Sequence, residues 1–277
     1  MDGERPDRED RPVTFLAAAG WTILLKILTE IAVTLVDAVH PGAFTDIVTI
    51  TASRVLAVSV VLFALLRVHA PEASVRRFIG FRTPPVGVLL LAAAAGAALA
   101  IPASWISTFL AEHLPKAAEE KSDVLEALLN TDTASRRAIL FATLVVVIPA
   151  SDELFFRGAL FTQLRRDRRA DVVILATAAY DALLNLMNPR GMLVMVVVLV
   201  TLGWLRTISG SVLPALILRV SFFGALLGPG LLNKPDLPTR PAWTLGALGV
   251  ALVSIVGMWA ICRSSEVAAA ARDEDEG

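Results

Sequence analysis

The chain has 277 residues, of which 56% are apolar and 18% charged, and its mean hydropathy is +0.68. Soluble globular domains contain about 45–50% apolar and about 25% charged residues, so this composition indicates a polytopic membrane protein. The 25 basic residues are balanced by 26 acidic residues, which leaves no net basic field for nucleic acid. A single cysteine, Cys262, excludes an internal disulfide.

Apolar runs along the chain predict about eight transmembrane helices, because each backbone N–H and C=O in hydrocarbon needs a partner within its own segment. The fifth and sixth runs are short against the ~20 residues that a bilayer requires, which suits helices that line a wet cleft. We expect an all-α membrane bundle over 14–262, with a tail at 1–13 and an acidic tail at 263–277. The eight runs are 14–39, 47–66, 86–110, 138–164, 172–187, 191–205, 212–228 and 242–262.

Basic residues between the runs favour one orientation. With the N-terminus inside, the inner segments hold 14 Lys and Arg residues and the outer segments hold 7. The positive-inside rule therefore predicts that both termini lie in the cytoplasm. The long outer connection, 111–136, is expected to lie as a short interfacial helix.

Nine charged residues lie inside the predicted spans, and each costs about 2.5–3.5 kcal/mol at a helix centre. Such residues should face the protein interior and pair with one another. Lys26 and Glu30 are spaced to neutralise each other on one helix face, whereas Arg54 needs a partner that the sequence does not identify. The others are Asp37, Asp152, Glu153, Arg157, Asp181 and Arg219.

The densest group of charges lies in the segment PASDELFFRG, residues 149–158. Glu153 and Arg157 share a helix face, while Asp152 points about 100° away. Two interpretations follow from this pattern. The residues form a salt bridge that lets the helix insert, or the second carboxylate marks a reaction site.

This segment resembles the EExxxR and FRG motif of the CAAX-protease and bacteriocin-processing (CPBP, Abi) family of intramembrane proteases. RRFIGFRTPP and LGWLRTISGSVLPALIL are similar to two further family segments, so the likeness covers about 76–225. The resemblance implies hydrolysis of a peptide bond in a membrane-associated peptide or protein. It implies Glu153 as the base that activates water, Asp152 as the preceding motif carboxylate and Arg157 as a structural counter-charge.

Two later family motifs are altered. The alignment places Asp181 and Asn185 at the Phe and His of the second motif, and Arg219 and Phe223 at the His and Asn of the third, so all four should line the cleft. Asn185 donates hydrogen bonds but does not shuttle a proton near neutral pH. Arg219 is permanently charged and is expected to be buried against Asp152, Glu153 or Asp181.

The three histidines that the chain does have are expected to be solvated at span ends or in loops: His40, His69 and His113. Without the two motif histidines no two-histidine metal site can be built there, carboxylates alone are poor zinc ligands, and we expect no metal and no cofactor.

Three functions remain open at this point. The first is a divergent protease that uses Glu153, the second is a catalytically inactive relative that holds a membrane peptide or partner helix, and the third is a small ion-coupled transporter. Twenty-one arginines against four lysines, with abundant Ala and Val, suggest a GC-rich bacterial source and hence the inner membrane.

Overall fold

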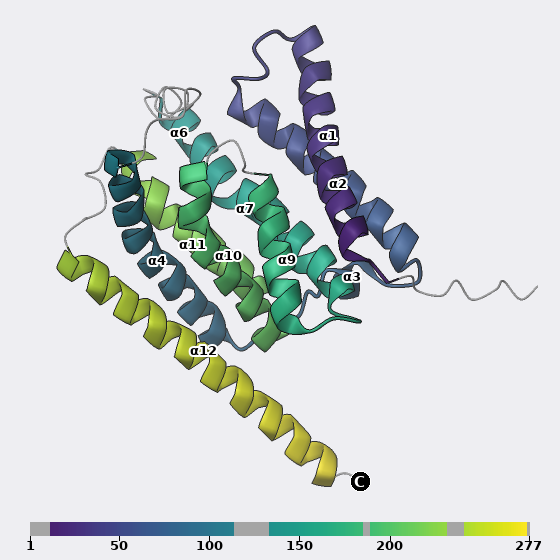
Figure 1. Ribbon diagram of the computed structural model, residues 1–277, viewed down its shortest axis with the longest axis vertical. Helices are drawn as coiled ribbons and strands as arrows, with labels where there is room; N and C mark the ends of the chain where they lie inside the picture. Colours follow the sequence, from purple (N-terminus) through teal and green to yellow (C-terminus); the bar gives the residue numbers. More distant parts are fainter. Residues whose placement is uncertain (1–11, 114–132, 185–188, 232–240, 276–277) are drawn as a thin grey trace, which may run out of the picture.

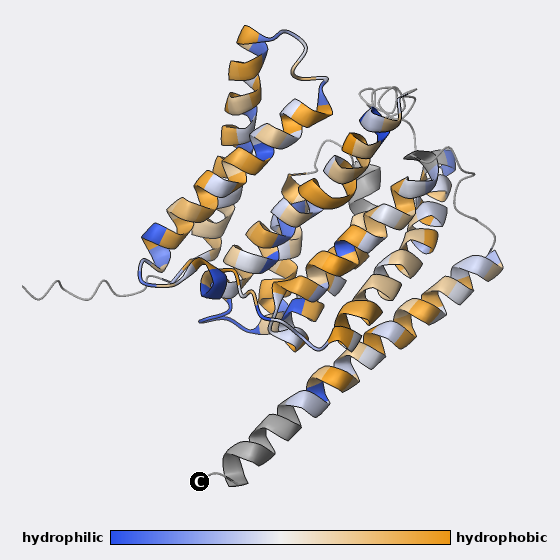
Figure 2. Cartoon of the chain, turned by 180° about the vertical axis from the view of Figure 1, so that it is seen from behind, coloured by the Kyte–Doolittle hydropathy of each residue, from blue (hydrophilic) through white to orange (hydrophobic). Residues whose placement is uncertain are grey.

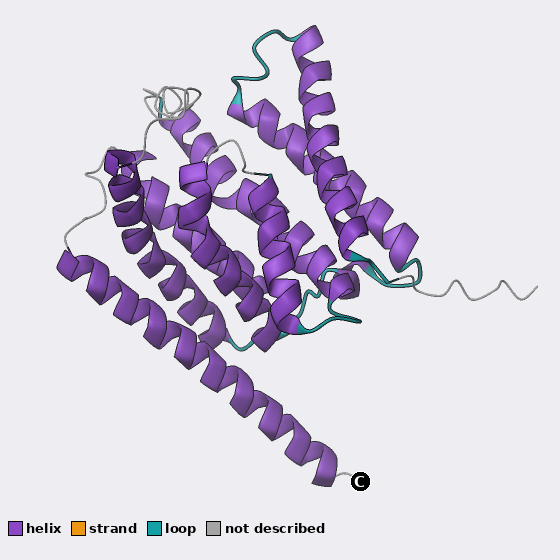
Figure 3. Ribbon diagram, viewed as in Figure 1, coloured by secondary structure: helices purple, strands orange, loops and turns teal. Residues whose placement is uncertain are grey.

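The computed structural model describes residues 12–113, 133–184, 189–231 and 241–275. Within these ranges the chain is helical and contains no strand (Figure 3). Its helices pack side by side in one bundle, with hydrophilic residues gathered on the short connections at one end (Figure 2). The predicted all-α class is confirmed.

A pair of long helices forms one side of the bundle (Figure 1). Helix α1 (Phe15–Val39) begins where the Thr14 hydroxyl accepts a hydrogen bond from the Ala17 backbone N–H, and α2 (Ile47–His69) begins where Asp46 accepts one from Thr49. These side chains satisfy backbone donors that the first helical turn leaves without a partner. The pair packs against the central segments through α1–α9 and α2–α7 contacts.

The central span changes its helical type twice. It runs from α6 (Ala134–Phe141) through the π-helix η1 (Ala142–Val147), α7 (Ile148–Glu153) and the π-helix η2 (Leu154–Leu160) to α8 (Phe161–Leu164). The sequence predicted one helical span here, 138–164, without its changes of helical type. A π-turn widens the helix and is often found at functional sites, and the charged motif lies across the junction of α7 with η2.

The remaining helices form the other side of the bundle. Helix α4 (Val86–His113) packs against α11 (Val212–Leu231) and α12 (Pro241–Asp275), while α10 (Pro189–Ser209) packs against α9 (Ala170–Leu183). At Gly96 of α4, a Cβ atom would lie 2.2 Å from the Leu218 carbonyl oxygen of α11. Glycine therefore permits the close approach of these two backbones, as small residues do between membrane helices.

Five helical stretches are long and apolar enough to cross a membrane: Ile47–His69, Val86–Leu110, Ala134–Leu164, Val212–Pro229 and Pro241–Ser265. Helix α1 is not among them, and α10 contributes a shorter apolar stretch, Val194–Ser209. The protein is a multi-pass membrane protein, and the count of eight spans stays a prediction.

The ends of the helices and the connections between them differ in part from the sequence-based expectations. The chain from 263 onward continues α12 as far as Asp275, and this end of the helix projects beyond the other helices (Figure 1). A four-residue helix that was not predicted, α3 (Val75–Phe78), precedes α4. The interfacial helix expected within 111–136 falls mostly outside the described residues.

Candidate functional site

Six charged side chains from five helical segments meet inside the bundle, between the α1–α2 pair and the α4–α11 side. We call this group the ion cluster. Its carboxylates come from α7 and α9, and its guanidinium groups come from α2, η2 and α11. The members are Arg54, Asp152, Glu153, Arg157, Asp181 and Arg219.

Arg219 lies at the centre of the ion cluster and contacts all three carboxylates. Its Nη1 donates to Glu153 Oε1 at 2.7 Å and to Asp181 Oδ2 at 2.9 Å, and its Nη2 donates to Asp152 Oδ2 at 3.0 Å. The expectation that Arg219 is buried against these acids is confirmed. One guanidinium group thus ties α11 to both α7 and α9 through charge-assisted hydrogen bonds.

Arg157 pairs with Glu153, as its helix spacing predicted, and also with a carboxylate on another helix. It donates a hydrogen bond to Asp181 on α9 and a second, at 3.0 Å, to the Leu199 carbonyl oxygen of α10. Its Nη1 lies 3.4 Å from Glu153 Oε1, the predicted partner four residues earlier. Arg157 therefore joins three segments of the bundle instead of serving only its own helix.

Arg54 supplies the third positive charge. Its Nε donates to Asp152 Oδ1 at 3.0 Å, and its Nη2 bonds to the same oxygen. This ion pair joins residues that are 98 positions apart in the chain, so the sequence did not identify Asp152 as the partner of Arg54. Its side chain is 20% exposed, whereas the other five members are at most 4% exposed.

The ion cluster is balanced in charge, with three guanidinium groups and three carboxylates. Removing such groups from water is costly unless each is paired and hydrogen-bonded. Three of its atoms nevertheless have no hydrogen-bond partner within the described part of the chain: Glu153 Oε2, Arg157 Nε and Arg219 Nε. The side chains predicted to line an open polar cleft are instead almost fully enclosed by protein.

Of the two other predicted cleft residues, the structure describes only Phe223, which is not part of the ion cluster. Phe223 is half-buried and packs on the apolar core, with its ring 5.3 Å from that of Phe222. Asn185 lies outside the described residues.

The histidines lie elsewhere. His40 and His113 are exposed, as expected. The expectation of a solvated His69 is wrong, because that side chain is buried and its Nε2 accepts a hydrogen bond from Trp21 Nε1 at 3.2 Å. An indole N–H at the neighbouring helix removes the need for water at this ring nitrogen.

Comparison with protein families supports the resemblance drawn from the motifs. Residues 134–225 match the family model described as Type II CAAX prenyl endopeptidase Rce1-like. The matched segment covers less than half of the chain but contains every member of the ion cluster except Arg54. The protein is thus a membrane protein with a CAAX-protease-like segment. Comparisons with curated proteins and with solved structures found no match.

Proposed function

We propose that this protein is a non-catalytic CAAX-protease-like membrane protein that binds a membrane-associated peptide or a partner helix without cleaving it. The observation that carries this proposal is the position of Arg219. Its guanidinium occupies one oxygen of Glu153 and contacts both neighbouring acids. A general base must take a proton from a water molecule that it contacts, and Arg219 holds one of the two Glu153 carboxylate oxygens in place of such a water molecule.

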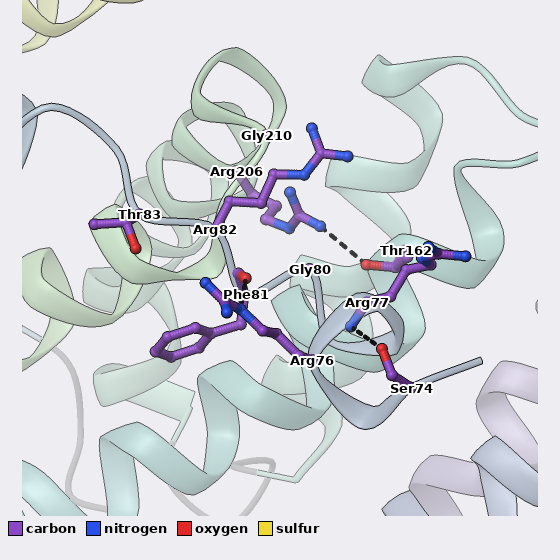
Figure 4. Close-up of a pocket in the computed structure, with 10 residues that line it drawn as sticks. All are labelled: Ser74, Arg76, Arg77, Gly80, Phe81, Arg82, Thr83, Thr162, Arg206 and Gly210. Carbon is purple, nitrogen blue, oxygen red and sulfur yellow. Dashed lines mark hydrogen bonds between the residues drawn. The ribbon is translucent and has the colours of Figure 1, made fainter.

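The arrangement within the membrane is part of the same proposal. The bundle would extend over 14–262, with its family-like core at about 76–225 and both termini in the cytoplasm of a bacterial cell. Support comes from the gathering of Arg76, Arg77, Arg82 and Arg206 around one end of the bundle, which the positive-inside rule assigns to the cytoplasm (Figure 4).

A second candidate function is peptide-bond hydrolysis by a water molecule that Glu153 activates. The specific observation in its favour is Glu153 Oε2, a buried carboxylate oxygen without a hydrogen-bond partner among the described residues. A water molecule bound to that oxygen could give its proton to Glu153, which would act as the base. Arg219 or Arg157 would stabilise the negative charge on the tetrahedral intermediate. The ion-coupled transporter gains no comparable support, because every charge of the ion cluster is paired.

The two candidates are separated by a cleavage and binding assay on the purified full-length chain. Prenylated and unprenylated C-terminal peptides and a leader-peptide library are incubated with the parent and with Glu153→Gln, and the products are read by mass spectrometry. Binding of the same labelled peptides is measured by fluorescence anisotropy. Melting curves of both proteins verify that the variant is folded.

We expect binding of at least one peptide class and no cleavage that depends on Glu153. Cleavage by the parent that Glu153→Gln abolishes would overturn the non-catalytic proposal and establish the hydrolase. Failure to bind any of the peptides, with no cleavage, would overturn the peptide-binding part of the proposal.

A further inference from the structure

A second concentration of charge lies outside the ion cluster, in a cavity of about 640 Å³ at the end of the bundle. The cavity is formed by the segment around α3, by α8 and by the turn between α10 and α11 (Figure 4). Four arginines line it together with Thr83 and Thr162, and none of the described residues that line it is acidic. The four are Arg76, Arg77, Arg82 and Arg206.

Arg206 is the most deeply buried of the four arginines in this basic cavity, and its side chain is held in place by contacts with the protein. It is only 7% exposed, and its guanidinium lies over the Phe161 ring, 5.6 Å from the ring centroid. Its Nε donates to the Arg157 carbonyl oxygen and its Nη2 donates to the Thr162 hydroxyl, each at 3.0 Å. These bonds fix the plane of the guanidinium and leave Nη1 without a hydrogen-bond partner in the described part of the chain.

The backbone around Gly80 is shaped to admit that guanidinium. Gly80 has a φ of +64°, and a Cβ atom at this position would lie 1.9 Å from Arg206 Nη2. Any other residue would both strain the left-handed backbone and occupy the place of the Arg206 side chain. The Gly80 carbonyl also accepts a hydrogen bond from the Val212 N–H at 3.2 Å, which holds this loop against the start of α11.

The rim of the basic cavity is anchored in the same way. The Arg82 carbonyl accepts a hydrogen bond from the Ser211 hydroxyl, and the Phe81 carbonyl accepts one from Arg76 Nε at 3.1 Å. The Arg77 and Arg82 side chains remain exposed. The backbone that carries the arginines is therefore fixed before any ligand arrives, which lowers the entropy lost on binding.

The charge of the basic cavity is not neutralised by the protein. None of its four arginines forms an ion pair with a carboxylate among the described residues, whereas all three arginines of the ion cluster do. Four like charges around one cavity repel each other unless an anion lies between them. Arginine forks match the oxygen geometry of phosphate in particular.

We propose that the basic cavity binds a phosphate group, either the headgroup phosphate of an anionic membrane lipid or that of a soluble phosphate compound. The cavity is much larger than a bare phosphate ion, which fits a phosphate ester. It lies at the end of the bundle assigned above to the cytoplasmic leaflet, where anionic lipids and basic pockets meet. This inference concerns a separate site and does not depend on whether peptides are bound or cleaved.

The experiment uses the full-length protein purified in a neutral detergent and has two arms. In the lipid arm, native mass spectrometry compares retention of phosphatidylglycerol with that of phosphatidylcholine of the same chain length. In the soluble arm, melting curves are recorded with sodium phosphate and with sodium chloride at equal ionic strength. Each arm includes Arg82→Gln, at the exposed rim, and the matched control Arg67→Gln, an exposed arginine at the end of α2.

We expect one arm or both to show selective binding to the parent. Arg82→Gln should weaken that binding about tenfold, equivalent to about 1.4 kcal/mol, and Arg67→Gln should leave it unchanged. Selective retention of phosphatidylglycerol identifies a lipid headgroup, and stabilisation by phosphate alone identifies a soluble ligand. The proposal is overturned if neither probe is preferred, or if Arg82→Gln and Arg67→Gln behave alike.

Discussion

Replacement of Arg219 by leucine tests the ion cluster most directly. Leucine places an apolar side chain at this position of α11 and removes the hydrogen bonds from Arg219 to Glu153, Asp152 and Asp181. The cluster would then hold three buried carboxylates against two guanidinium groups. The variant therefore leaves one buried negative charge uncompensated, which costs more than the loss of an equivalent neutral contact.

The expected magnitude follows from burial. Breaking a buried ion pair by removing one partner costs about 3–5 kcal/mol, and Arg219 and Glu153 are 3% and 0% exposed. For a chain of this size each kcal/mol lowers Tm by about 2–4 °C, so we expect a fall in Tm of about 6–20 °C for Arg219→Leu. An exposed pair contributes only about 0–1 kcal/mol.

The assay is thermal unfolding in a neutral detergent, with Arg169→Leu as the matched control. Arg169 pairs with Asp171, and these side chains are 83% and 57% exposed, so the control should lose at most about 1 kcal/mol. The double variant Arg219→Leu/Asp181→Leu restores the charge balance. Its loss should be smaller than the sum of the single losses by about 0.5–3 kcal/mol. If Arg219→Leu melts like Arg169→Leu, the ion cluster does not stabilise the fold and the reasoning is refuted.

Three further predictions rest on single contacts. Gly96→Ala should destabilise by about 1–3 kcal/mol or more, because the new Cβ meets the backbone of α11, while Gly20→Ala, with open space around it, should be neutral or stabilising in the same melting assay. Equal effects of the two glycine variants would contradict the close packing of α4 on α11. Arg54→Leu should cost about 1–3 kcal/mol, less than Arg219→Leu, since Arg54 meets one carboxylate and is partly exposed; a larger loss would be evidence against this ranking. The hydrogen bond from the Thr49 hydroxyl is the main cause that lowers the pKa of Asp46. The stabilisation that the ionised Asp46 gives to the start of α2 is therefore present at neutral pH and is lost as the pH falls through that lowered pKa. Asp46→Ala should therefore cost about 1 kcal/mol at neutral pH and less in acid, whereas Asp46→Asn keeps the cap; a loss that does not change with pH would exclude the charged cap.

Much of the fold could be predicted because apolar length is a local property of the sequence. Helices occupy the described part of each predicted run. The mid-helix charge of Arg219 could be assigned to nearby acids because an unpaired guanidinium in hydrocarbon is too costly. The motif around Glu153 also predicted the family segment that the comparison found.

The remainder depends on contacts between distant segments. Arg54 meets Asp152 because α2 packs on α7. Arg157 bonds to Asp181 because α9 packs on η2, a contact between helices that spacing along one helix does not predict. The basic cavity was not predicted, although Gly80 next to a run of arginines was a usable signal. The enclosure of the acids reflects side-chain packing, which periodicity does not encode.

The composition of the ion cluster has a consequence for the order in which the chain is made. Arg54, Asp152, Glu153, Arg157 and Asp181 are all synthesised before α11, and together they carry one more negative than positive charge. Arg219 is the last of the six to leave the ribosome, so the earlier helices enter the membrane with an excess acid that they cannot neutralise among themselves. A chain that ends before α11 would therefore hold three carboxylates against two guanidinium groups, and its buried charges could not be balanced.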